Sequence, residues 1–386
     1  MFKVWFFCGK KIQQRDGGCM KYFKKALLIC GLGGLLFSNI QAYATPVTGY
    51  SWGSRNITYQ NNGSNNFYIN IWTNARDEWN LSTDVFLKAG TNSKFTAGNK
   101  SDSGVTWDGL AEWTFSIITG NYSTMKTWVN TYYTTQSHYN TDNVEGIATH
   151  EFGHALGLDH APYGNPTVMT PNTFERKSSG TLVDGRPNKS PTSWDINTVN
   201  VLYDNNFAKA QNPELVLDVP ENILQKALIT QKELKINHYS WAIGYSTLEA
   251  RAYDADLIVS GIVKNKLSPL IKNDGETEEA FHQSEVAIEN VIKGEGSKGD
   301  TIILRQIGGE TDTSIIYHEN STELQEGTEV LMYLKKIDDN VYIPINEDES
   351  IFIKQGVQSL KPGDSSFKNL YDNRLVTLDE ASASIN

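Results

Sequence analysis

One eleven-residue segment constrains the fold of this 386-residue chain more than any other feature: His150-Glu151-Phe152-Gly153-His154-Ala155-Leu156-Gly157-Leu158-Asp159-His160. On a helix, residues i and i+4 lie on the same face, so His150 and His154 can bind one metal ion. Gly157 allows a sharp turn with positive φ, which would end the helix and bring His160 back as a third ligand. Three protein ligands leave the fourth position of a tetrahedral zinc ion for water, which is typical of a catalytic rather than a structural site.

Glu151 follows the first of these ligands and would project beside the metal, where it can accept a proton from water. The pentapeptide HExxH alone is as compatible with an ordinary amphipathic helix that carries two surface histidines. Gly157 and His160, at their offsets, favour the zinc site strongly. Asp142 and Glu145 read as a capping box and predict a helix that begins just before Asn143.

The extended motif HExxHxxGxxH is the signature of the metzincin metalloproteases, and the chain resembles their matrixin branch. The resemblance implies that Met169, nine residues after the last histidine, forms the Met-turn beneath the zinc. Pro171 stands two residues further on, as in matrixins, where astacins and serralysins have a zinc-contacting tyrosine. Asp195-Ile196 is similar to the start of the last matrixin helix, although Trp194 replaces a second acidic residue there. Without the upstream motif, Met169 would be read as a core methionine.

The resemblance also implies a fold and a substrate cleft. The expected fold class is α+β: a catalytic domain with a twisted mixed sheet and an active-site helix, followed by a small antiparallel β barrel or sandwich. Residues 108–113 stand where matrixins have the edge strand that aligns a substrate, with the pair Leu110-Ala111, and a peptide would pair with this edge as an added strand. The same residues can also be read as an unrelated strand–turn fragment. The pocket for the side chain after the cleaved bond would include Pro171, Asn172 and Thr173.

The implied cofactor is one catalytic zinc ion. Glu112 stands where the family often has a histidine for a second zinc ion, so a second zinc site is not expected. Calcium, bound by carboxylates and carbonyls, is compatible with the sequence, although no motif points to it.

The first 44 residues predict a secretory signal, with Met20 as the expected start of translation and cleavage after Ala44. Lysines at 21, 24 and 25 precede an apolar run, 26–37, that is too short for a comfortable membrane span. All three cysteines lie before the predicted cleavage point, so the secreted chain would have no disulfide and no cysteine to block the zinc. We therefore expect an extracellular bacterial enzyme without an N-terminal pro-domain and without stable membrane insertion.

Composition divides the rest of the chain into two halves. Residues 45–205 hold 10 basic and 14 acidic residues and seven tryptophans, whereas the remainder holds 17 basic and 30 acidic residues. We predict a protease domain at 45–205, a linker or helical connection at 206–245, and an acidic all-β domain at 246–386. Within the first half, 66–79 reads as a helix.

Further strands are expected from β-rich runs that turn signals separate. These runs are 84–88, 125–134, 255–263, 284–292, 301–307, 329–334, 341–345 and 351–354. An OB-like barrel is one candidate for the second half, although its acidic balance argues against nucleic-acid binding. His238, His282 and His318 are scattered, and we expect them to lie on the surface.

The leading hypothesis is a secreted zinc endopeptidase that acts on proteins or peptides, with His150, His154 and His160 as zinc ligands and Glu151 as general base. In the alternative, the acidic β domain carries the main role, either by targeting and partner binding or by occupying the enzyme's own cleft as an intramolecular inhibitor. A zinc-binding pseudo-enzyme is disfavoured because Glu151 is present.

Overall fold

The computed structural model describes residues 45–116, 119–162, 165–204, 219–273, 277–355 and 366–385. They belong to one compact unit, Ala44–Asn386. The predicted signal segment with its cleavage site, and the predicted start of the connection at 211–213, lie outside the described residues. Among the described helices, none combines the length and apolar character needed to cross a membrane.

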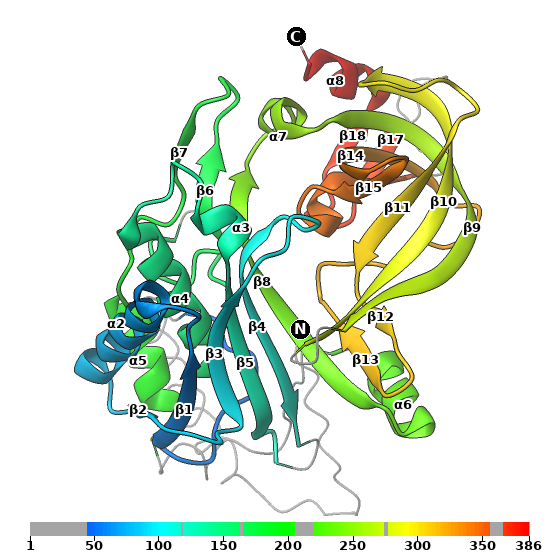
Figure 1. The fold of residues 1–386 in the computed structure, drawn as a ribbon. Coiled ribbons are helices and arrows are strands. Elements are labelled where there is room, and N and C mark those ends of the chain that lie inside the picture. Colours follow the sequence, from blue (N-terminus) through cyan, green and yellow to red (C-terminus); the bar gives the residue numbers. More distant parts are fainter. Residues whose placement is uncertain are drawn as a thin grey trace, which may run out of the picture. The chain divides into compact units, whose positions relative to one another are not determined.

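Ten strands of the described chain form a first, mixed sheet in the order β12-β13-β8-β4-β5-β3-β1-β2, with β6 paired to β8 and β7 paired to β6 (Figure 1). Their bounds are β1 Asn56–Asn62, β2 Phe86–Ala89, β3 Phe95–Lys100, β4 Trp107–Phe115, β5 Tyr122–Asn130, β6 Asn172–Arg176, β7 Leu182–Asp184, β8 Glu233–Tyr245, β12 Gly309–Glu310 and β13 Ser314–Tyr317. The pairs β1–β2, β1–β3 and β3–β5 are parallel, while β4 is antiparallel to β5. The expected mixed sheet is therefore present.

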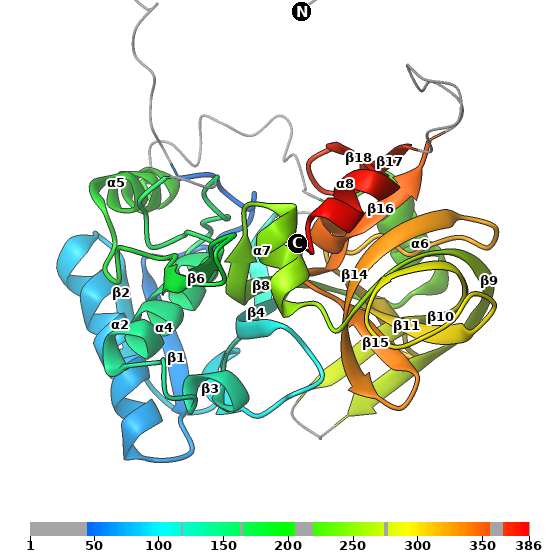
Figure 2. The ribbon, with the colours of Figure 1, turned by 90° about the horizontal axis from the view of Figure 1, so that it is seen from above.

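Two long helices, α2 (Asn66–Ser82) and α4 (Thr141–Ala155), lie side by side (Figure 2). Helix α2 begins where the Asn65 side chain accepts hydrogen bonds from two backbone N–H groups of the first turn, which satisfies donors that a helix end leaves unpaired. Its buried face includes Trp72 and Trp79, and the Trp79 indole donates to the Thr149 carbonyl at 2.9 Å. This contact fixes α2 against the helix that carries the histidine motif.

The remaining described helices are short: α3 Thr131–Thr134, α5 Ser193–Leu202, α6 Glu221–Thr230, α7 Leu248–Asp254, α8 Leu378–Ala383 and the 3-10 turn η1 Glu347–Ser350.

A second sheet of eight described strands follows, in the order β15-β11-β10-β9-β14-β16-β17-β18. Its strands are β9 Leu257–Asn273, β10 Glu278–Lys293, β11 Thr301–Ile307, β14 Glu329–Asp338, β15 Val341–Pro344, β16 Ile351–Lys354, β17 Ser366–Asn369 and β18 Leu375–Thr377. All its pairings are antiparallel except β11–β15, and β15 also pairs with β14. A second, largely antiparallel β region is thus present, and its classification as barrel or sandwich stays a prediction.

The structure corrects three local expectations. Helix α4 begins at Thr141, because Asn140 and Asn143 form the capping box, with side chain to backbone bonds of 2.9 and 3.1 Å. Asp142 therefore lies in the first turn rather than at the cap. The strand expected at 125–134 ends at Asn130, where the chain turns into α3.

The third correction concerns the histidines outside the motif. His238 and His318 are buried, each with 3% of the side chain's residue surface exposed, so the surface prediction was wrong for both. His238 lies on β8, which has a neighbouring strand on each side, and its side chain contacts the protease half of the chain. His282 is partly exposed.

Candidate active site

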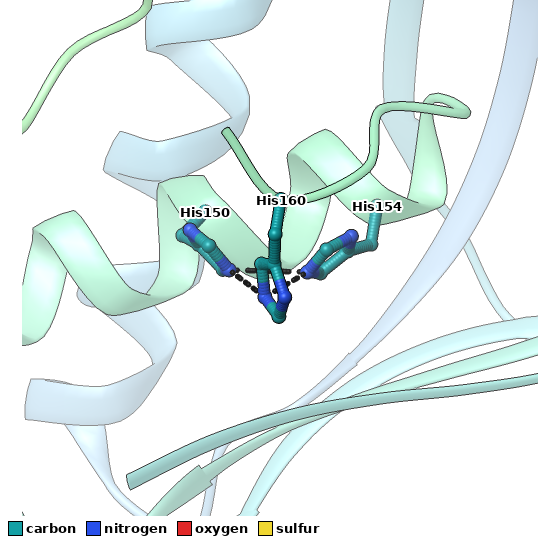
Figure 3. A group of neighbouring side chains, drawn as sticks. All are labelled: His150, His154 and His160. Atoms are coloured by element: carbon teal, nitrogen blue, oxygen red, sulfur yellow. Dashed lines mark hydrogen bonds between the residues drawn. The ribbon is translucent and has the colours of Figure 1, made fainter. Parts of the chain in front are cut away.

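Helix α4 and the turn after it bring the three motif histidines together (Figure 3). Gly157 has φ +95°, as the motif predicts, and an added Cβ would lie 2.5 Å from the Tyr50 carbonyl oxygen. The Nε2 atoms of His150 and His154 are 3.0 Å apart, and each lies 3.2 Å from Nε2 of His160. The predicted metal ligands therefore converge on one point.

The hydrogen bonds at the back of the rings determine which nitrogens face that point. His150 Nδ1 lies 2.8 Å from the Val168 carbonyl oxygen, and His154 Nδ1 lies 2.9 Å from that of Leu158. A carbonyl only accepts, so each Nδ1 carries the proton and donates. Each Nε2 then presents a lone pair toward the other, an arrangement that a cation between them satisfies and a hydrogen bond between them does not.

These residues fit a zinc ion. Zinc–nitrogen bonds of about 2.0–2.1 Å in a tetrahedral site place the nitrogens about 3.3 Å apart, close to the separations found. Burial lowers the pKa of all three histidines well below that of free histidine, which favours the neutral, metal-binding form. Among the described residues, one further group of potential ligands exists, formed by Asp159, His160, His238 and Glu319.

Met169 forms the floor of the site. It is fully buried, and the nearest atom to a Cβ built on Gly153 of helix α4 would be its sulfur, at 2.3 Å. The preceding residue, Val168, supplies the carbonyl that holds His150. Asp195 accepts hydrogen bonds from the Thr192 backbone and hydroxyl and from Thr45, and thereby holds the start of α5 beside this turn.

Glu151 lies on α4 within the same buried region. Both of its carboxylate oxygens are buried and have no hydrogen-bond partner among the described residues. Burial raises its pKa well above that of free glutamate; the nearby Arg186 opposes this shift and Asp108 adds to it. A carboxyl group in such surroundings holds a proton readily, which is the property that a general base needs.

Arg186 and Asp108 were not singled out by sequence reasoning. Arg186 is fully buried and donates to the Thr170 carbonyl at 3.1 Å and to the Thr173 hydroxyl at 3.3 Å. Asp108 is also fully buried; burial raises its pKa, Arg186 opposes that rise, and Tyr139 donates to it at 2.8 Å. No local pattern marks these residues, because they are 78 positions apart and meet only in the folded chain.

The predicted substrate-binding residues lie on the two strands that flank β8. Leu110 and Ala111 are in the middle of β4, and both are buried. Pro171 precedes β6, which begins with Asn172 and Thr173, also buried. The structure therefore brings both predicted segments to one place.

Comparison with known families gives the same assignment as the geometry. The matrixin family model matches residues 72–203, about a third of the chain. Residues 72–203 form a matrixin-like metalloprotease domain. The matched range contains helix α4, the three histidines, Glu151 and Met169, so this matrixin-like domain is that of a zinc metalloendopeptidase.

Solved structures with similarity to the chain include three with metalloprotease or toxin titles. One is high choriolytic enzyme 1, a hatching enzyme zinc-protease from the medaka fish Oryzias latipes, with 16% identity, 40% of this chain and 95% of that chain covered, and a TM-score of 0.26. Another is myroilysin, with 14% identity, coverage of 42% and 98%, and a TM-score of 0.28. A third is the GM1-bound ECX AB5 holotoxin, with 16% identity, coverage of 42% and 86%, and a TM-score of 0.27. Identities and TM-scores this low add nothing to the family match, and no curated protein matches the chain.

Proposed function

We propose that the matrixin-like domain is a secreted zinc endopeptidase in which His150, His154 and His160 hold the metal and Glu151 is the general base. The observation that carries the proposal is the convergence of three unprotonated Nε2 atoms beside a buried carboxylate. A zinc ion bound there would polarise the scissile carbonyl and lower the pKa of a water molecule.

Glu151 performs the proton transfers. Its carboxylate takes a proton from water during attack on the peptide carbonyl and delivers it to the leaving amine. The burial that raises its pKa brings the carboxylate closer to the pH at which proton acceptance and release are both efficient. Met169 positions the ligands from below and takes no part in the chemistry.

The substrate is an extended segment of protein. The β4 edge with Leu110 and Ala111 supplies backbone groups for an added strand, and Pro171, Asn172 and Thr173 line the pocket beyond the cleaved bond. The signal-like segment 1–44 supports secretion, so the substrates we expect are extracellular proteins of a bacterial environment.

The test compares the zinc-loaded chain with Glu151→Gln on a quenched fluorescent peptide library. We expect one zinc per chain in both proteins and a fall in cleavage of about 100-fold or more in the variant. Glu145→Gln, on the same helix, is the matched control and should cut like the parent. A Glu151→Gln chain that holds zinc and cuts at the parental rate would show the mechanism to be wrong.

A further inference from the structure

Strand β8 lies between the two segments that the proposed function assigns to the substrate. It is antiparallel to β4, from Trp241 opposite Trp107 to Ile236 opposite Trp113. It is parallel to β6, and the Trp241 backbone N–H donates to the Pro171 carbonyl at 2.7 Å. The edge to which a peptide would add is thus already occupied by a strand of the same chain.

The two faces of β8 have different neighbours, as expected for a strand whose side chains alternate. Tyr239 and Trp241 belong to a buried cluster that includes Phe281 and Ile307 of the second sheet. His238, one position along, instead contacts Trp113 and the metal-ligand histidines. One face of β8 therefore covers the active site while the other is held by the C-terminal region.

His238 is the residue of β8 nearest the metal ligands. Its ring centroid lies 5.1 Å from that of His154 and 5.6 Å from that of His160. Its Nδ1 is buried without a hydrogen-bond partner and lies 3.5 Å from an oxygen of Asp159. An imidazole thus covers the side of the metal centre that faces β8.

Ser240 lies two residues further along, where the predicted pocket begins. The Arg186 guanidinium, which also binds the Thr170 carbonyl and the Thr173 hydroxyl, donates to its hydroxyl at 2.5 Å. Ser240 is itself fully buried. A residue of β8 therefore shares its hydrogen-bond donor with the segment that is expected to line the pocket.

From these contacts we propose that β8 is an intramolecular occupant of the peptide-binding cleft, which keeps the protease latent until the strand is displaced. The inference rests on the proposed function, since latency requires an activity to suppress. A tethered strand competes at an effective concentration of about millimolar or more, so a micromolar peptide would rarely displace it. The sequence has no cysteine after Cys30, and β8 with His238 does the work of a blocking thiol.

The opening variant is Ala242→Pro in the full chain. The Ala242 backbone N–H donates to the Thr106 carbonyl at 3.1 Å, and proline removes this donor from a strand that is paired on both sides. Ala242→Ser keeps the donor and serves as the control at the same position. We expect hydrogen exchange of the β8 amides to accelerate at least tenfold in the proline variant only.

Two functional readouts accompany exchange, both on zinc-loaded chains. A short peptide ending in a hydroxamate, a metal-chelating group, should bind at least tenfold more tightly to Ala242→Pro than to the parent or to Ala242→Ser. Peptide cleavage should rise at least tenfold in the same variant. Unchanged binding in a proline variant whose β8 exchanges faster would overturn the proposal.

A reversible lock tests the same point without destabilising β8. Glu112 and Asn237 are direct partners in the antiparallel pair, and the Cα separation of such partners suits a disulfide. In Glu112→Cys/Asn237→Cys combined with Ala242→Pro, oxidation should abolish the gain in hydroxamate binding and cleavage, and reduction should restore it.

The outcomes separate the two proposals. If the oxidised chain binds and cuts as well as the reduced chain, β8 does not block the cleft, while the protease assignment stands. If opening restores hydroxamate binding but no variant cuts any peptide, β8 does occupy the cleft and the proposed peptidase activity is wrong.

Discussion

At the scale of single residues, Gly153 is the position on which the geometry of the metal centre depends most directly. A Cβ there would meet the Met169 sulfur at 2.3 Å and Trp79 at 3.3 Å, all inside the core. Overpacking of this kind costs about 1–3 kcal/mol, more than the gain of about 1 kcal/mol from replacing a helical glycine. We expect Gly153→Ala to lower the free energy of unfolding by about 1–2 kcal/mol, measured by urea denaturation. Gly146→Ala on the same helix is the control.

Gly146 differs from Gly153 in the neighbour that an added Cβ would meet. That neighbour is the Lys189 side chain, at 2.8 Å from its Cδ, and a lysine side chain can move aside. Gly146→Ala should therefore be neutral or stabilise by up to about 1 kcal/mol. If both alanine variants were equally stable, the floor of the site would tolerate the extra methyl group and the argument from Met169 would fail.

At the scale of elements, helix α4 depends on its cap at Asn140. The Asn140 side chain accepts from the Asn143 backbone N–H, and the Asn143 side chain accepts from the Asn140 backbone N–H. Replacing such a cap with alanine costs about 1 kcal/mol. We expect Asn140→Ala to lose about this much in urea denaturation, whereas Asp142→Ala, the cap that the sequence pattern predicts, should lose only a few tenths. The reverse order would mean that the helix starts where the sequence pattern places it.

At the scale of the whole molecule, stability should fall with rising pH because of Glu347. Its carboxyl accepts from the Ile307 backbone at 3.2 Å and from Ser321 at 2.9 Å, and burial raises its pKa to about 8. Unfolding returns the pKa to about 4.3. Between these values the unfolded chain has lost the proton that the folded chain keeps, so rising pH favours unfolding. The contribution is about 1.4 kcal/mol per pH unit within this window.

Glu347→Gln removes this titration while keeping an acceptor and a donor at the same place. In urea denaturation at pH 5 and pH 8, the loss of stability toward pH 8 should be smaller in the variant than in the parent by several kcal/mol. Glu295→Gln, at an exposed position, should leave the parental pH dependence intact. Equal pH dependence in all three proteins would mean that Glu347 is ionised in the folded state.

The chain's sequence by itself determined the chemistry of residues 150–160 and the elements with strong local patterns. Helix periodicity places His150 and His154 on one face, and Gly157 takes the positive φ that returns His160, so local rules suffice. The strands at 301–307 and 351–354 were likewise predicted with the bounds that the structure has.

The tertiary structure alone decided what surrounds that chemistry. Residues 206–245 read as a linker or a helical connection, and only α6 fits that reading, since β8 pairs with a strand more than a hundred residues earlier. Arg186, Asp108 and His238 reach the site by the same kind of non-local contact. Strand pairing depends on partners distant in sequence, so no window around β8 contains the information that places it against β4.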